Sequence, residues 1–153
     1  MKIAILICLL VAAALAVTDP SIKLIPPGPG RDVVVKVCGE CHPADNFRSK
    51  RFDRDGWTEQ VNNMMGQGAK ANDAEQDLII GYLTAVFGPD SKIYMNTAPY
   101  SEVRAVLGLT LAETTALIEY RKEHGDFKDW QQVAKIPGVG AVKVEAKKDL
   151  MVF

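Results

Sequence analysis

The sequence is poor in the residues that cross-link a chain or bind metals in clusters. Its 153 residues include three cysteines and two histidines, and one of the cysteines, Cys8, lies in the first apolar run. A disulfide-rich framework is therefore excluded, because such folds need several pairs of cysteines. The chain also has almost no excess of either charge, since 18 basic and 19 acidic side chains give a formal net charge of −1. The chain as a whole is not an electrostatic match for nucleic acid.

Long hydrophobic runs are limited to the N-terminus. Residues 1–16 read MKIAILICLLVAAALA, with one lysine, an apolar run and a small-x-small triplet that ends at Ala16. This pattern predicts a secretory signal peptide that is cleaved after Ala16 and takes Cys8 with it. The run is shorter than a membrane span requires, so a retained anchor is the weaker alternative. We expect a periplasmic or extracellular protein without a membrane partner after cleavage, with residues 17–27 as an extended segment.

Residues 38–42, which read CGECH, carry most of the chemical information. The pattern C-x-x-C-H is the attachment signature of a c-type haem, in which two thiols bond covalently to the porphyrin and the histidine binds the iron. Half of a zinc site is one alternative, but zinc needs four ligands and His124 is the only other histidine. A dithiol redox motif is the second alternative, and it gives the adjacent histidine no role. We predict one haem c, held by Cys38, Cys41 and His42.

The rest of the first half predicts a small helical domain. A Pro/Gly-rich turn over residues 26–30 precedes it, and the polar stretch 43–55 is expected to be a loop. Apolar residues recur at helical spacing in stretches that we expect to form helices. These stretches are 31–41, 57–65, and 72 or 73 to 87.

Residues 28–90 resemble a class I c-type cytochrome domain. The resemblance rests on the C-x-x-C-H run, on Gly30 eight residues before it, on the pair Tyr82-Leu83 in the last helix and on a methionine before Gly68-Ala69. It implies that His42 and a methionine are the two axial ligands of the iron. Met64 fits the family spacing better than its neighbour Met65, and a site without a methionine ligand is the third reading.

The resemblance also implies what the first half does. With both axial positions filled, the iron offers no vacant site to dioxygen or peroxide and changes only its valence. We therefore expect one-electron transfer to a redox partner protein, and we expect that the protein is not an enzyme. A peroxidase with an open sixth site is the distant alternative. The charged residues 53–55 are expected to form a solvated face rather than a catalytic site.

The second half predicts two successive units of helix, glycine turn and helix. The glycine turns are expected at residues 107–110 and 136–140, and Gly125 is expected to end the second helix. Ser101 is the expected N-cap of the first helix. The four helices are expected at 101–106, 111–123, 130–135 and 141–150.

This half resembles the tandem helix-hairpin-helix domain of ComEA-type DNA receptors. The matching features are Asn96-Thr97-Ala98, the segment IEYR from Ile118 to Arg121, Gly125-x-Phe127 and Pro137-Gly138-Val139-Gly140. The resemblance implies that Gly138, Val139 and Gly140 meet DNA phosphates, with Lys143, Lys147 and Lys148 as electrostatic support. In the first hairpin, Leu109-Thr110 replaces the family's isoleucine-glycine pair, which removes one close backbone approach. A similar double hairpin serves as a protein-docking module in an extrinsic subunit of photosystem II.

The sequence therefore predicts an all-α protein with a small class I cytochrome c domain at 28–90 and a tandem helix-hairpin-helix domain at 91–153. The favoured function is a secreted monohaem electron carrier whose second half docks a protein partner or self-associates. The alternative is a haem-bearing protein that binds double-stranded DNA independently of its sequence.

Overall fold

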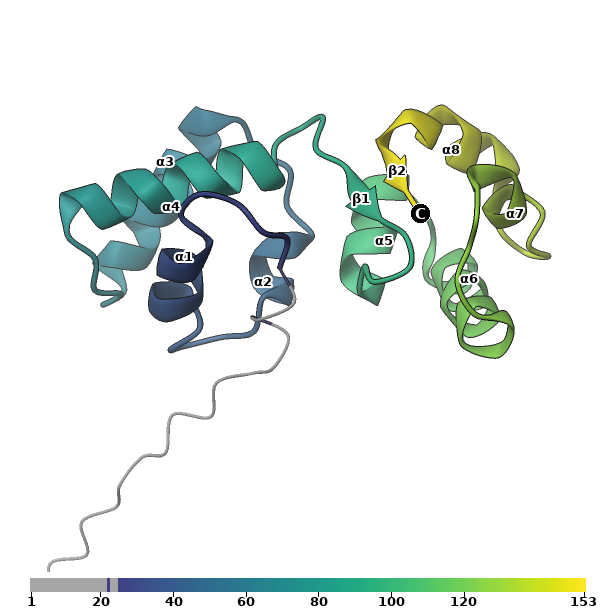
Figure 1. Cartoon of the computed structure of the whole chain (residues 1–153), viewed down its shortest axis with the longest axis horizontal. Helices are drawn as coiled ribbons and strands as arrows, with labels where there is room; N and C mark the ends of the chain where they lie inside the picture. Colours follow the sequence, from purple (N-terminus) through teal and green to yellow (C-terminus); the bar gives the residue numbers. More distant parts are fainter. Residues whose placement is uncertain (1–21, 23–24) are drawn as a thin grey trace, which may run out of the picture.

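The computed structural model describes residue 22 and residues 25–153 (Figure 1). The signal peptide expected at residues 1–16 lies outside the described residues. Two groups of helices lie next to each other, and the chain passes from α4 of the first group to β1 of the second (Figure 1). Within the described part of the chain, no helix combines the length and apolarity that a membrane crossing requires. The fold is mostly helical, as the sequence predicts.

The first group contains four helices, α1 (Arg31–Cys38), α2 (Asp45–Arg48), α3 (Arg54–Gly66) and α4 (Asp73–Val86). Local sequence sets where the longer helices begin. The Asp53 carboxylate accepts a hydrogen bond from the Gly56 backbone N–H at 2.9 Å and caps α3. At the start of α4, Asn72 and Glu75 form a capping box, because each side chain accepts from the other residue's backbone N–H, at 2.9 and 3.0 Å.

The core of the first group lies where α1 and α3 pack against α4. Trp57 is fully buried, and its indole N–H donates to the Phe87 carbonyl oxygen at 3.1 Å. The described residues of the predicted extended segment belong to this core as well. Ile22 and Ile25 are buried in it, and the Tyr82 hydroxyl donates to the Pro26 carbonyl oxygen at 2.6 Å. The first helical unit therefore includes residues that precede position 28.

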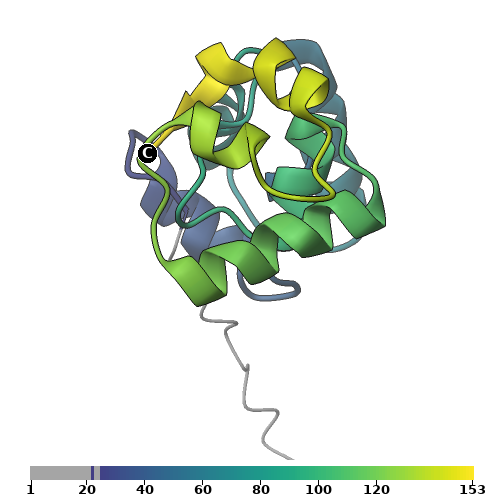
Figure 2. The same ribbon diagram turned by 90° about the vertical axis from the view of Figure 1, so that its right-hand side faces the viewer.

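The second group contains the helices α5 (Tyr100–Leu107), α6 (Leu111–His124), α7 (Trp130–Ala134) and α8 (Ala141–Ala146), followed by a 3₁₀ turn (Lys148–Leu150). A short parallel ribbon closes the group, since β1 (Ile93–Tyr94) pairs with β2 (Met151–Val152). Figure 2 views the molecule from the side of this second group, and in that view α6 runs below α7 and α8. The ribbon pairs residues near the start of the second group with residues near its end, so it holds the two ends of this group together.

Four local predictions are wrong. The first predicted helix, 31–41, ends at Cys38, and the predicted loop 43–55 contains α2 and the start of α3. Ser101 lies inside α5, because Pro99 occupies the N-cap position and offers no side-chain acceptor. The last predicted helix, 141–150, ends at Ala146, because the chain tightens into the 3₁₀ turn Lys148–Leu150, which leads into β2.

Candidate functional site

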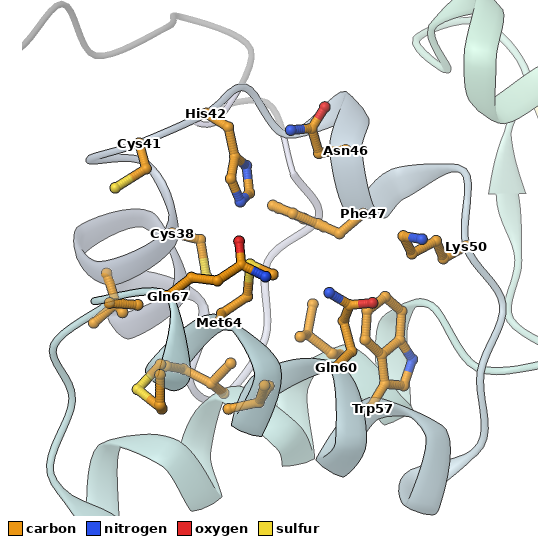
Figure 3. Close-up of a pocket in the computed structure, with 16 residues that line it drawn as sticks. Cys38, Cys41, His42, Asn46, Phe47, Lys50, Trp57, Gln60, Met64 and Gln67 are labelled. Carbon is orange, nitrogen blue, oxygen red and sulfur yellow. The ribbon is translucent and has the colours of Figure 1, made fainter.

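A cavity of about 430 Å³ opens between α1, the segment after it, α3 and α4 (Figure 3). Its volume lies in the range of ~300–1,000 Å³ that small-molecule and cofactor sites occupy. Most of its wall is apolar. The apolar lining residues are Val37, Phe47, Trp57, Val61, Met64, Met65, Ala69, Ile79 and Leu83. Such a wall offers few hydrogen-bonding groups to whatever the cavity holds.

Three predicted haem residues, Cys38, Cys41 and His42, line this cavity. The His42 Nδ1–H donates to the Pro43 carbonyl oxygen at 3.2 Å. Because a carbonyl oxygen only accepts, this hydrogen bond requires the tautomer with the proton on Nδ1, which leaves the Nε2 lone pair available. Metal-binding histidines usually donate their second ring N–H in this way, which fixes the ring and its tautomer. His42 is therefore prepared to bind a metal through Nε2.

The two cysteines differ in their surroundings, and both are free thiols. Cys38 ends α1 and is half-buried, whereas Cys41 is exposed. Burial, with a smaller contribution from Cys41, raises the pKa of the Cys38 thiol to about 11. A thiol that stays protonated at neutral pH is unsuited to a dithiol redox centre, which needs a thiolate. No group of three or more His, Cys, Asp or Glu side chains that could hold a metal occurs among the described residues, so they offer no ligand set for a structural zinc.

Both candidate methionines come from the last turn of α3 and line the same cavity. Figure 3 places Met64 beside Cys38 and below His42. The structure thus brings Cys38, His42 and Met64 onto one cavity, although α2 and most of α3 lie between His42 and Met64 in the sequence. Met64 and Met65 are both half-buried, so the assignment of Met64 as the iron's sixth ligand stays a prediction.

One end of the cavity is polar, a feature that the sequence did not indicate. Lys50 and Gln60 line this end, on the side away from Cys41 in Figure 3, whereas Asn46 lies beside His42 and Gln67 lies near Cys38. A porphyrin attached through its vinyl groups would have its carboxylate edge on the opposite side from the cysteines. The residue types at both ends therefore fit a haem. Spacing alone could not have selected Lys50 or Gln60, because both belong to ordinary polar stretches.

The two glycine hairpins of the second half have the same backbone form. Gly108 and Gly138 adopt left-handed φ angles of 64° and 84°. Each lies two residues before the N-cap of the next helix, which is Thr110 for α6 and Gly140 for α8. Glycine is favoured at such angles because it lacks a Cβ atom. The internal repeat that the sequence predicts is therefore present, although the N-cap residue after the glycine turn is threonine in the first hairpin and glycine in the second.

A carboxylate from the first hairpin lies against the second. A Cβ atom added to Gly140 would lie 2.5 Å from Glu113 Oε1, and the Lys143 Nζ forms an ion pair with Glu113 Oε2 at 2.8 Å. The bonds from Lys143 and Thr110 lower the pKa of Glu113 to about 2. An ionised carboxylate therefore occupies the face of Gly140 that was predicted to meet phosphate, and it neutralises Lys143.

The other predicted DNA-contact residues have no common arrangement. Lys147 and Lys148 are exposed, and the Lys148 Nζ lies 5.6 Å from the centre of the Trp130 ring. Gly138 is exposed, and Val139 is half-buried and packs against the core of the second half. The two lysines keep their charge available to solvent, but nothing in their contacts directs them toward the hairpin.

Comparisons with known proteins concern the second half. Residues 89–151 match the family described as the helix-hairpin-helix motif. A stretch of 63 residues, 40% of this chain, is 30% identical to an uncharacterized protein of Haemophilus influenzae and covers 56% of it. A stretch of 57 residues, 37% of this chain, is 37% identical to endonuclease/exonuclease/phosphatase family domain-containing protein 1 of human and mouse, and covers 10% of those proteins. No solved structure shows a significant match.

The fold and the family match together define a mostly helical protein with a helix-hairpin-helix motif in its second half. This confirms that part of the sequence prediction. The chain spans little more than half of the length of the Haemophilus influenzae relative and a tenth of the length of the mammalian ones. The sequence similarity is therefore limited to the helix-hairpin-helix module. Motifs of this kind mediate contacts with nucleic acids or with proteins.

Proposed function

We propose that this chain is a secreted monohaem c-type cytochrome that carries single electrons. One observation carries the proposal: the CGECH segment folds onto the wall of an apolar cavity with a methionine-bearing turn of α3 on the same cavity. The hydrogen bond from His42 Nδ1 to Pro43, which frees Nε2, supports it. Secretion rests on the N-terminal sequence, and a purified protein that begins at Val17 would support it.

When bound, the haem supplies a one-electron couple between ferric and ferrous iron. The residues of the chain hold and tune it. Cys38 and Cys41 would provide the two thioether links, and His42 Nε2 would bind the iron. Met64 would close the sixth position, which leaves no place for a small oxidant. The apolar walls exclude water and so favour the less charged, reduced state.

The absorption spectrum of the purified protein tests this proposal. We expect covalent haem that stays with the chain after denaturation, and its loss in a Cys38→Ala/Cys41→Ala variant. We also expect the oxidised protein to show the weak near-infrared band of a sulfur–iron bond. Met64→Ala should remove that band, and the matched variant Met65→Ala should keep it. The reverse result would move the ligand by one residue, and a wild type without covalent haem would contradict the proposal.

For the second half, we propose docking to a protein, either a redox partner or another copy of this chain. The starts of α6 and α8 present apolar side chains, since Leu111 is 62% and Val142 is 81% exposed. The nearest cation, Lys143, is already paired with Glu113. An apolar surface with an internally neutralised charge suits a protein better than a polyanion.

Double-stranded DNA is the second candidate partner, favoured by the intact Gly138-Val139-Gly140 turn and by the helix-hairpin-helix match. A titration of the full-length protein with duplex DNA at several salt concentrations separates the two. DNA binding would be independent of sequence, at about micromolar or weaker affinity, and a Lys147→Ala/Lys148→Ala variant would flatten its salt dependence. The control is Lys122→Ala, which removes an exposed lysine of α6, outside the second hairpin. If no binding occurs even at low salt, protein docking is the function of this half.

A further inference from the structure

The two halves meet at three charged side chains, the buried Arg48 and Glu102 and the partly buried Arg51, which we term the interface triad. Glu102 belongs to α5 of the second half, whereas the two arginines belong to α2 and the turn after it. Both Glu102 and Arg48 are 4% exposed. The Glu102 carboxylate accepts from Arg48 Nε at 3.0 Å and from Arg51 Nη2 at 2.9 Å. One carboxylate therefore holds two guanidinium groups across the boundary, where α2 and α5 pack together (Figure 1).

The interface triad is directly connected to the wall of the cavity. Arg51 Nη1 donates to the carbonyl oxygens of Arg48 and Lys50, at 2.6 and 2.8 Å, which fixes the turn after α2. Phe47 and Lys50, the sequence neighbours of these arginines, both line the cavity. The Phe47 ring also lies 6.4 Å from the His42 ring, centre to centre. Along this segment, Phe47 and Lys50 thus face the cavity, whereas Arg48 and Arg51 face the second half.

α2 cannot hold this position by its own stability. It has four residues, and isolated helices shorter than about 12–15 residues are marginal in water. Its place depends on tertiary contacts, and its strongest directional contacts are the charge-assisted hydrogen bonds to Glu102. The wall that carries Phe47 and Lys50 is therefore held in part from the other half of the molecule.

We propose that Glu102 is a positioning residue for the haem cavity: through Arg48 and Arg51 it keeps α2 closed against the cavity from outside the cytochrome-like half. This inference rests on the proposed function of the first half. It implies that a partner bound to the second half is linked to the electron-carrying site through α5 and α2. The helix-hairpin-helix module then affects the electron-carrying site in addition to docking a partner.

The reduction potential of the holoprotein tests the proposal, because the two effects of Glu102→Gln have opposite signs. Removal of a negative charge would by itself raise the potential. Loosening of α2 would admit water, which stabilises the more charged oxidised state and lowers the potential. We expect the potential of Glu102→Gln to fall below that of the wild type. Glu119→Gln, an exposed residue of α6 with the same charge change, should stay within error of the wild type.

Hydrogen exchange of the α2 backbone amides provides a readout that does not depend on the haem. We expect faster exchange at residues 45–51 in Glu102→Gln, with α4 unchanged, and an intermediate rate in Glu102→Asp, which keeps the charge on a shorter side chain. If Glu102→Gln does not yield folded protein, Glu102→Asp carries both measurements. An equal or higher potential together with unchanged exchange would overturn the positioning role. A wild type without covalent haem would contradict the proposed function instead, and the exchange rates would still test the contact.

Discussion

Replacing Glu102 with glutamine should destabilise the fold far more than removing an exposed charge. The carboxylate and Arg48 are both 4% exposed, and its two partners lie at 2.9 and 3.0 Å. Removal of one member of a buried ion pair costs about 3–5 kcal/mol, because the remaining charge stays buried without compensation. Glutamine keeps one acceptor oxygen, so we expect the lower end, about 3 kcal/mol. Two guanidinium groups would then share a neutral amide at the boundary of the two halves.

Urea denaturation followed by far-ultraviolet circular dichroism measures this loss. With a denaturant dependence of ~2 kcal/mol/M, a loss of ~3 kcal/mol lowers the midpoint by about 1.5 M. The matched variant is Lys36→Gln, which removes an ion pair with Glu75 of similar length, 2.9 Å, but with the lysine side chain 67% exposed. An exposed pair contributes about 0–1 kcal/mol. If both variants shift the midpoint equally, burial does not strengthen the interface triad and the reasoning is wrong.

Two further predictions concern the second half and one helix of the first. The folded-state pKa of Glu113 is about 2 against an ordinary value of 4.5, so the unfolded chain takes up the proton first. The contribution of Glu113 to stability is therefore complete above about pH 5 and is lost as the pH falls toward 2. Glu113→Gln should flatten this part of an acid-denaturation curve. An unchanged slope would contradict the ion pair with Lys143. Gly138→Ala should lower stability by about 1–2 kcal/mol because its φ is +84°. Gly81→Ala, inside α4 with open space around the added Cβ, should raise stability by about 0.5–1 kcal/mol. Thermal melts of both glycine variants measure the two effects, and equal shifts would refute the argument from φ.

Features that depend on neighbouring residues were predictable from the sequence. The helices predicted from residue 72 or 73 to 87 and over 111–123 agree with α4 and α6 to within a residue or two. The glycine hairpins at Gly108 and Gly138 follow from turn chemistry, and the family match confirms the module that they form. These signals act over a few residues, so no knowledge of the packing is needed to interpret them.

The candidate site could be predicted only in part. The CGECH motif predicts haem attachment at Cys38, Cys41 and His42, because a porphyrin would require that local spacing, and all three residues line the cavity. The remaining walls come from α2, α3 and α4, and their approach depends on how the helices pack. Lys50 and Gln60 at the polar end carry no local pattern that distinguishes them from other surface residues.

The sequence by itself determined the helical class, the order of the two units, the position of the C-x-x-C-H run and the two hairpins, since each is encoded within a short stretch. Only the tertiary structure decided which residues meet across long separations. Glu102 pairs with Arg48 from 54 positions away, Lys143 meets Glu113 from 30 positions away, and β1 pairs with β2 across the whole second half. The physical reason is that a buried charge or a strand edge is satisfied by whatever partner the packing brings within reach, and a linear sequence does not specify that partner.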